Sequence, residues 1–361
     1  MKTIILTGGG TGGHVIPNLS LIPLLKKHFD RICYIGGSGI EKDLVAHEKN
    51  VEYFEIPTHK FVRKNIFKNI FLPFKVFLTS LKCKKILKEL SPNIVFSKGG
   101  YVSFPVCLGA KFLKVPVVGH ESDLTLGMAN KLIAKLSKSF CTTFPQTAKT
   151  LKNGIFTGSP IRKQLFLGSK EKGIELCSLT DTSKPYVLIT GGSTGAKDLN
   201  DVVFKSIPTL CKKYNVIHLV GKNKLNPKIA HKNYYQAEFC YNIEHFFALS
   251  DVVISRSGSG AICELLALKK PMILVPLPKG TSRGDQVENA EFFKSQNFAM
   301  VINQCDLTPK VLCSEIEKTL QNKKNIVTAM NNLTAETLTN GTQNIVTEIL
   351  KVTALKQNSH T

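Results

Sequence analysis

The sequence predicts an α/β protein built from two Rossmann-like domains, each a doubly wound parallel sheet. Short apolar runs repeatedly enter glycine-rich turns that begin helical patterns, as strand–turn–helix units do. The segment ILTGGGTGG near the start matches LITGGSTGA almost position for position about 183 residues later. Two similar units with a cleft between them are the simplest account. A length of 361 residues also suits two domains.

The composition is strongly basic, with a formal net charge of +22. Such a charge indicates an anionic partner, either nucleic acid or a membrane surface. No zinc knuckle, RNA-binding aromatic signature or basic helix-turn-helix stands out, which disfavours nucleic acid. The ten cysteines show no CxxC spacing and resemble the reduced thiols of a cytoplasmic protein. No apolar run reaches the roughly 18 residues of a membrane span, and the N-terminal run is too short for a signal peptide.

The first strand, Ile4 to Leu6, enters a glycine-rich turn that ends at His14. The turn contains GxGxxG, a dinucleotide fingerprint that is weak by itself. The fingerprint requires an acid at the end of the second strand, but strand 32–35 runs into glycines and the first acid is Glu41, which disfavours NAD. His14 begins a helix expected to reach Phe29, and a helix N-terminus keeps an imidazole neutral and able to accept a proton. His14 is therefore a candidate base, with a structural or exposed histidine as the alternative.

Residues 61–88 differ abruptly from their surroundings, with eight Lys or Arg, five Phe and no acid. Cationic side chains beside large apolar ones favour adsorption to an anionic bilayer. The alternative is a buried amphipathic helix with a solvated lysine face.

Two more turns follow apolar strands in the first half. Strand 93–96 precedes a turn with Gly99, Gly100 and Tyr101, and strand 115–119 precedes His120–Asp123. A doubly wound sheet places its site at the carboxyl ends of its strands, where these turns meet. Glu121 is a second candidate base, and a buried structural carboxylate is the alternative.

The polar stretch 162–185 indicates a domain boundary. We expect an N-terminal domain at 1–161, a C-terminal domain at 162–340 and a final helical segment at 341–361 that packs back on the first domain. Strand 186–190 enters the second glycine-rich turn, 191–196. Near the C-terminus we expect helices at 309–321 and 324–350 and a frayed end at 356–361.

The stretch 251–289 carries the strongest binding pattern. Strand 251–255 leads through Arg256, Ser257, Gly258, Ser259 and Gly260 to a helix expected from about Ala261. Unpaired backbone N–H groups at a helix N-terminus favour a diphosphate, with Arg256 nearby. Glu264 is the only charged residue of the helix, so it binds a ribose diol or, alternatively, complements the helix dipole.

A second apolar strand, 272–276, leads into a polar loop at the same edge of the sheet. Gln286 and Asn289 are three residues apart, so they share one face of the next helix. We expect their amides to bind sugar hydroxyls and an acetamido group; ordinary helix-start polar residues are the alternative.

Together these motifs resemble the MurG family of N-acetylglucosamine transferases, which act in peptidoglycan synthesis. The resemblance rests on seven ordered segments: GGGTGGHVIPN at 8–18, SKGGYVSFP at 97–105, HESD at 120–123, GSPIR at 158–162, GGSTGA at 191–196, SRSGSGAICE at 255–264 and SRGDQVENA at 282–290. It implies a GT-B fold, with the lipid acceptor on the N-terminal domain and UDP-GlcNAc mainly on the C-terminal one.

The resemblance also implies roles for individual residues. Thr11, Gly12 and Gly13 approach the donor, and His14 is the candidate catalytic histidine. Arg162 and Ser193 contact the nucleotide, whose uracil meets the backbone at Cys240 and whose ribose binds Glu264. Gln286 contacts the sugar. Gly99, Gly100 and Tyr101 lie on the acceptor side. Asp123 stands where some members have an asparagine near the sugar, and Cys240 replaces an aliphatic residue.

The reaction implied is attack of the muramyl 4-hydroxyl of lipid I on C1 of GlcNAc, with inversion and loss of UDP. No DxD-type acidic pair stands in a metal-binding context, so we expect neither a metal nor another cofactor. The protein is expected at the cytoplasmic face of a bacterial membrane as a peripheral protein. A glucosyltransferase acting on another lipid such as diacylglycerol, or a non-catalytic sugar-nucleotide sensor, are the rival functions.

Overall fold

The structure, a computed structural model, describes residues 1–61, 66–192, 195–280, 283–332 and 340–358. The chain divides into two compact units. Unit 1 comprises Met1–Ile161 with Thr337–Thr361, and unit 2 comprises Arg162–Glu336.

Unit 1 contains a seven-stranded parallel sheet with the strand order β3-β2-β1-β4-β5-β6-β7. The reversal of order at β1 and β4 is the topological switch point of a doubly wound sheet. The strands are β1 (Thr3–Thr7), β2 (Arg31–Gly36), β3 (Val51–Glu55), β4 (Ile94–Ser97), β5 (Val117–Glu121), β6 (Ser139–Thr142) and β7 (Gly154–Phe156).

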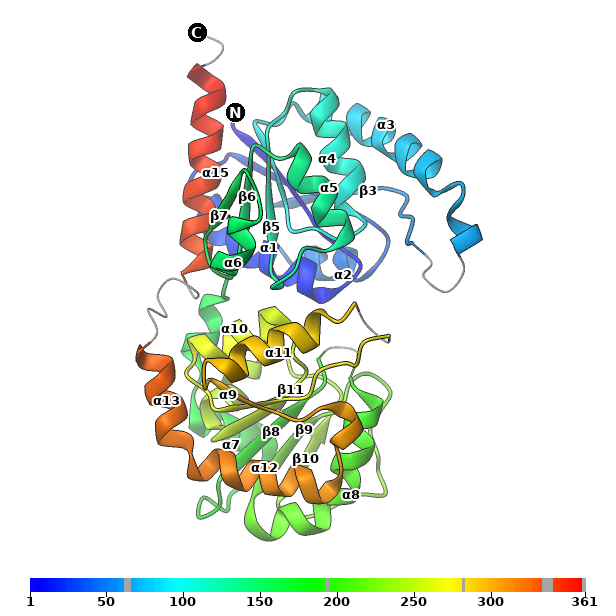
Figure 1. Cartoon of the computed structure of the whole chain (residues 1–361). Helices are drawn as coiled ribbons and strands as arrows, with labels where there is room; N and C mark the ends of the chain where they lie inside the picture. The colour runs from blue at the N-terminus through cyan, green and yellow to red at the C-terminus, as the bar shows by residue number, and fades with distance from the viewer. Residues whose placement is uncertain (62–65, 193–194, 281–282, 333–339, 359–361) are drawn as a thin grey trace. The chain divides into compact units, whose positions relative to one another are not determined.

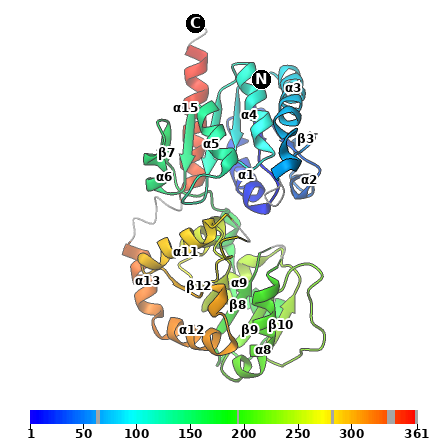
Figure 2. The ribbon, with the colours of Figure 1, turned by 45° about the vertical axis from the view of Figure 1, so that its right-hand side comes forward.

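Helices cover both faces of this sheet. They are α1 (Gly12–Leu25), α2 (Ile40–Ala46), η1 (Ile66–Asn69), α3 (Leu72–Leu90), α4 (Ser103–Phe112), α5 (Met128–Leu136), α6 (Pro145–Lys149) and α15 (Gly341–Asn358). Ile4 and Leu6 pack on one face with α1 and α15, whereas Ile5 packs on the other with α3, α4 and α5. The C-terminal helix α15 thus completes the core of the N-terminal unit (Figures 1 and 2).

Unit 2 contains a six-stranded parallel sheet with the order β10-β9-β8-β11-β12-β13. The strands are β8 (Tyr186–Thr190), β9 (Asn215–Leu219), β10 (Tyr234–Ala237), β11 (Val252–Ser255), β12 (Met272–Leu274) and β13 (Ala299–Val301). The helices are η2 (Lys163–Leu167), α7 (Lys170–Cys177), α8 (Lys197–Lys213), α9 (Ile243–Leu249), α10 (Ser259–Ala267), α11 (Asp285–Ser295), η3 (Gln304–Asp306), α12 (Pro309–Gln321) and α13 (Lys323–Asn332).

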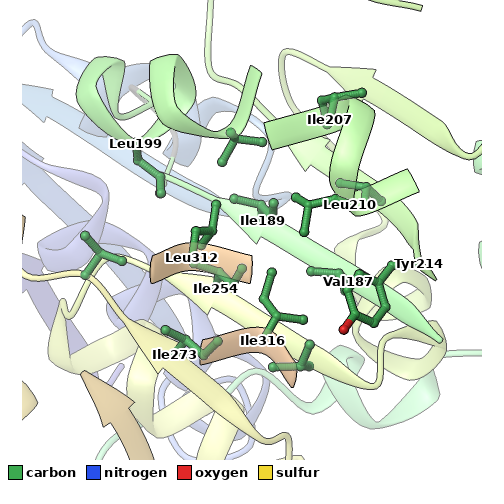
Figure 3. Close-up of a cluster of buried hydrophobic side chains, with 14 of the residues drawn as sticks. Val187, Ile189, Leu199, Ile207, Leu210, Tyr214, Ile254, Ile273, Leu312 and Ile316 are labelled. Carbon is green, nitrogen blue, oxygen red and sulfur yellow. The ribbon is translucent and has the colours of Figure 1, made fainter. Parts of the chain in front are cut away.

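One core of unit 2 lies between its sheet and two helices. Leu199 and Leu210 of α8 and Leu312 of α12 pack against Val187, Ile189 and other inward residues of the strands (Figure 3). These β-branched and leucine side chains are fully or almost fully buried, which orders the strands whose carboxyl ends carry the binding loops.

Expectations about several elements need correction. Among the described residues, the range expected as a single helix at 324–350 contains α13 and α15, and 333–339 lie outside the described residues. The polar stretch 162–185, expected as a connection between domains, contains η2 and α7. Packing of α7 against α9 stabilises this helix despite its few apolar residues. The end expected to fray from Lys356 remains helical to Asn358.

Candidate active site

In unit 1 the turn after β1 places His14 in the first turn of α1. The Thr11 hydroxyl and Nδ1 of His14 are hydrogen-bonded at 3.0 Å. A neutral imidazole carries a hydrogen on only one of its two nitrogens. Nε2 of His14 can therefore act as a base only when Nδ1 carries that hydrogen and donates it to Thr11.

The turn after β4 packs directly on this first turn. Gly100 has a φ of +85°, and a Cβ there would lie 2.5 Å from the carbonyl oxygen of Gly9 and 3.3 Å from Nδ1 of His14. A Cβ at Gly10 would lie 2.6 Å from Cε1 of Tyr101. The predicted acceptor-side residues 99–101 therefore lie beside the turn that carries His14, within one unit.

Glu121 at the end of β5 is buried and organises its own loop. One carboxylate oxygen accepts the backbone N–H groups of Ser122 and Asp123 at 2.9 and 3.1 Å, and the other accepts Gly127 N–H and Asn130 Nδ2, each at 2.9 Å. Burial and the Asp123 carboxylate raise the pKa of Glu121, while the hydrogen bonds oppose that rise. Four hydrogen bonds favour the structural alternative for Glu121 over the base.

In unit 2 the second glycine-rich turn follows β8. Gly195 has a φ of +67°, and a Cβ there would lie 2.1 Å from the carbonyl oxygen of Val220, so only glycine fits. A Cβ at Gly192 would instead meet nothing within 4 Å. Ser193, the predicted nucleotide contact, lies outside the described residues.

The turn after β11 contains a buried cation. Arg256 is only 8% exposed; its Nη1 donates to the carbonyl of Val275 at 3.1 Å, and its Nε has no partner among the described residues. Burial lowers the pKa of Arg256, and Asp198 partly offsets this. Helix α10 begins at Ser259, two residues earlier than expected, and a Cβ at Gly258 or Gly260 would meet nothing within 4 Å. The glycines at the N-terminus of α10, two and four residues after Arg256 in the chain, therefore leave open space over the start of the helix.

Two predicted sugar-binding amides differ in position. Asn289 is fully buried, and its Nδ2 donates to the carbonyl of Ser257 at 3.3 Å, so it supports the turn. The sugar contact of Asn289 stays a prediction. Gln286 is half-buried, and its Oε1 accepts the N–H of Leu277 at 3.1 Å. The Ser257 hydroxyl donates to the carbonyl of Gln286 at 2.8 Å, which joins the two loops.

Arg162 and Glu264 form a bidentate ion pair. Nε and Nη2 of Arg162 lie 2.9 and 3.0 Å from the two carboxylate oxygens of Glu264. The sequence predicted that both residues bind the nucleotide but did not predict their pairing. A paired guanidinium orients the carboxylate, and each oxygen retains a second lone pair.

Cys240 follows β10 and is half-buried, and burial raises the pKa of its thiol. Its neighbours Phe239 and Tyr241 are exposed and stack edge to face, with ring centroids 5.0 Å apart.

The basic segment forms η1 and α3 with an apolar face directed to solvent. Phe67, Phe71 and Phe74 are 83%, 70% and 62% exposed. Phe77, Leu78 and Leu81 continue this apolar face, whereas Cys83 and Leu87 on the other side of α3 are buried against the unit. Among the described residues, no helix is both long and apolar enough to cross a bilayer.

Known proteins resemble the chain over almost its whole length. Sequence profiles of the glycosyltransferase family 28 N-terminal and C-terminal domains match residues 4–142 and 186–349. A Clostridium tetani relative, named UDP-N-acetylglucosamine--N-acetylmuramyl-(pentapeptide) pyrophosphoryl-undecaprenol N-acetylglucosamine transferase, is 44% identical over 98% of this chain and 99% of its own length. A relative of the same name from Lachnoclostridium phytofermentans is 46% identical over 92% and 94%. The chain belongs to the MurG family.

Solved structures agree with this assignment. The crystal structure of Acinetobacter baumannii MurG has 25% sequence identity and a TM-score of 0.75, with 97% of this chain and 100% of that chain covered. The UDP-GlcNAc 2-epimerase of Neisseria meningitidis, at 16% identity and a TM-score of 0.69, shares the fold. The predicted family and the GT-B fold class, with two Rossmann-like domains, are confirmed.

Sequence reasoning about this MurG-family chain missed one residue that shapes the site. Glu41 was noted only as an acid in the wrong place for NAD, yet its carboxylate accepts the backbone N–H of Gly10 at 3.2 Å. Its position just after Gly36–Gly39 was the available signal, because glycines at a strand end permit close approach of another group.

Proposed function

We propose that this chain transfers N-acetylglucosamine from UDP-N-acetylglucosamine to the muramyl 4-hydroxyl of undecaprenyl-pyrophosphoryl-MurNAc-pentapeptide, with inversion, converting lipid I to lipid II in peptidoglycan synthesis. The printed name of the relatives at 44% and 46% identity describes transfer of N-acetylglucosamine onto a pyrophosphoryl-undecaprenol acceptor. Family membership over nearly the full length supports extending that activity to this chain.

The observation that carries the proposal is the open N-terminus of α10, which the buried Arg256 precedes by three residues in the chain. A buried cation is costly unless an anion compensates it. The first N–H groups of α10 lack intrahelical acceptors, and Gly258 and Gly260 leave space over them. UDP gains negative charge as it leaves, so these donors stabilise the transition state more than the bound donor.

The other nucleotide and sugar contacts are proposed around this diphosphate position. Glu264, oriented by Arg162, accepts the ribose hydroxyls, and the backbone at Cys240 meets uracil. Gln286 reads the sugar, and Ser193 contacts the nucleotide. All of these residues belong to unit 2.

Unit 1 supplies the acceptor side in this proposal. Gly99, Gly100 and Tyr101 border the acceptor, while Thr11, Gly12 and Gly13 approach the donor. The proton of the attacking hydroxyl passes to Nε2 of His14, whose Nδ1–H is donated to Thr11. His14 is preferred to Glu121 because the Glu121 carboxylate is engaged in four hydrogen bonds. Asp123 is proposed to contact the sugar.

We also propose that unit 1 adsorbs to the anionic, cytoplasmic surface of the membrane through residues 61–88. The exposed phenylalanines of η1 and α3 are flanked by Lys75, Lys82 and Lys85. Unit 1 has 25 Lys and Arg against 10 Asp and Glu, a net charge of +15, whereas unit 2 has 23 against 16, a net charge of +7. Apolar insertion and electrostatic attraction therefore favour the same unit.

Radiolabelled UDP-GlcNAc and UDP-glucose offered with lipid I or with diacylglycerol test the function. We expect product only from UDP-GlcNAc and lipid I, and we expect Glu264→Ala to raise the donor KM at least tenfold, because charged hydrogen bonds to the ribose are lost. Glucosylated diacylglycerol would establish the rival transferase. Nucleotide binding without release of UDP in the presence of acceptor would establish the sensor.

A further inference from the structure

Glu41 connects the ends of two neighbouring strands of unit 1. It lies in the first turn of α2 and is 1% exposed. One carboxylate oxygen accepts the N–H of Gly10, after β1, at 3.2 Å, and the other accepts the N–H of Gly37, after β2, at 3.1 Å. A single buried carboxylate therefore holds two glycine-rich turns together.

The surrounding backbone is shaped to admit this carboxylate. A Cβ at Gly9 would lie 2.6 Å from a Glu41 oxygen, and a Cβ at Gly37 would lie 2.9 Å from it. The hydroxyl of Tyr34 donates to the carbonyl of Gly8 at 2.7 Å, and that of Tyr53 donates to the carbonyl of Gly37. Both turns are thus fixed through backbone N–H and C=O groups.

The Gly10 N–H has a further consequence for ligand binding. In a phosphate-binding glycine turn, such N–H groups point at the anion. Here Glu41 occupies the Gly10 N–H, and its negative charge disfavours an anion at that position. The turn at Gly10 is therefore less suited to an anion than the turn before α10, although both turns are rich in glycine.

Gly10 is linked to His14 through one intervening residue. Gly10 precedes Thr11, whose hydroxyl is hydrogen-bonded to Nδ1 of His14. The φ of Gly10 is +84°, and the ring of Tyr101 fills the space that a Cβ at Gly10 would need. A shift of Gly10 would move both the hydroxyl that orients the imidazole and the surface on the acceptor side.

We propose that Glu41 is a positioning residue: it sets the turn 8–11 and, through Thr11, the orientation of the His14 imidazole. The catalytic part of this inference rests on the proposed function. In this inference Glu41 acts through the backbone of Gly10 and Gly37 rather than by contact with a substrate.

Glu41→Gln tests the proposal, with Asp43→Asn, an exposed carboxylate on the same helix, as the matched control. The glutamine keeps the size but places an NH₂ group against one of the two N–H donors. We expect kcat to fall roughly tenfold to hundredfold, with the donor KM and the UDP affinity within about twofold, because misplaced catalytic groups reduce the chemical step. Asp43→Asn should retain the wild-type kcat.

Two further measurements separate positioning from loss of folded protein. If Glu41 acts through His14, Glu41→Gln combined with His14→Ala should be no slower than His14→Ala alone. Multiplied defects would overturn the inference. Hydrogen exchange should accelerate at the amides of residues 8–14 in Glu41→Gln while the strands of unit 1 stay protected.

Hydrogen exchange also distinguishes this inference from the proposed function. Unchanged exchange at residues 8–14 would overturn the positioning role even if the wild-type protein converts lipid I. Faster exchange in a protein that transfers no sugar would support the positioning of the turn and reject the transferase.

Discussion

At the scale of single residues, buried polar side chains hold the binding loops in place. Asn289 supports the turn at Ser257, Asn130 supports the loop after β5, and Glu41 supports the turn at Gly10. The three-residue spacing of Gln286 and Asn289 did not predict that the Asn289 amide donates to the carbonyl of Ser257. Which face of α11 points inward is decided by packing, and three-residue spacing alone does not contain that information.

His218 is another buried residue of this kind, and it makes the stability of unit 2 depend on pH. It is fully buried; Nδ1 lies 3.0 Å from the hydroxyl of Tyr234, and Nε2 lies 3.1 Å from Oδ1 of Asn200. Because the amide nitrogen of Asn200 donates to the carbonyl of Val220 at 2.8 Å, the neutral ring donates from Nε2 and accepts at Nδ1. Burial lowers the pKa of His218 to about 3.

The unfolded chain binds a proton at this histidine below about pH 6.5, whereas the folded chain stays neutral down to about pH 3. The free energy of unfolding should therefore fall by about 1.4 kcal/mol per pH unit from this group as the pH drops from 6 to 4. Urea unfolding of wild type and His218→Gln between these values measures it: the wild-type curve should be steeper. The exposed His28→Gln is the control, and equal slopes for wild type and His218→Gln would contradict the prediction.

At the scale of elements, α3 argues against the alternative of a buried amphipathic helix in the basic segment, while adsorption to a membrane stays a proposal. A buried amphipathic helix would turn its phenylalanines inward and its lysines outward. Instead the inward face carries Thr79, Ser80, Cys83 and Leu87, and the phenylalanines of the first half face solvent. The sequence shows the phenylalanines and lysines of this segment, but it did not predict that the small residues of α3 form the face that packs against α4.

Replacing Phe71 and Phe74 with serine should weaken adsorption to phosphatidylglycerol vesicles at least tenfold, since burying each phenylalanine contributes about 1.5–3 kcal/mol. Co-sedimentation at several salt concentrations measures the apolar and electrostatic contributions, because salt screens only the latter. The matched control is Phe166→Ser with Leu167→Ser, an equally exposed apolar pair in unit 2. Vesicle binding that is unaffected by the α3 substitutions would argue against adsorption through this face.

At the scale of the whole molecule, the C-terminal helix completes the N-terminal unit. Ile345, Val346, Ile349 and Val352 of α15 are buried with Ile4 and Leu6 of the first strand. The Thr342 hydroxyl accepts the backbone N–H of Ile161 at 3.1 Å, and Asn344 donates to the carbonyl of Thr157 at 2.9 Å. The end of the chain is therefore tied to the last residues of unit 1 before unit 2 begins.

Ile349→Ala should lower the free energy of unfolding by about 2–5 kcal/mol, the usual cost of a large-to-small change in a core. Leu355→Ala, an exposed position on the same helix, should change it by less than about 0.5 kcal/mol. Urea denaturation measures both, and hydrogen exchange at residues 1–161 should show that the loss falls on unit 1. Equal effects of the two substitutions would mean that α15 adds nothing to that core.

The sequence by itself determined the elements with strong periodic patterns. The strand at 186–190 and the helix at 309–321 were predicted with the bounds that the structure has, because hydrophobic period and caps such as Thr308 and Pro309 act locally. Weakly patterned strands such as β3, β7 and β10, which are short or half-exposed, were not identified.

Only the tertiary structure decided which of the candidate site residues meet. The pairing of Arg162 with Glu264, the four hydrogen bonds on Glu121 and the reach of Glu41 from α2 to Gly10 join residues brought together by strand order and helix packing. A motif states which chemical groups are available near a turn. Whether a group faces a ligand or another side chain depends on contacts between segments far apart in the chain, and the local sequence does not encode those contacts.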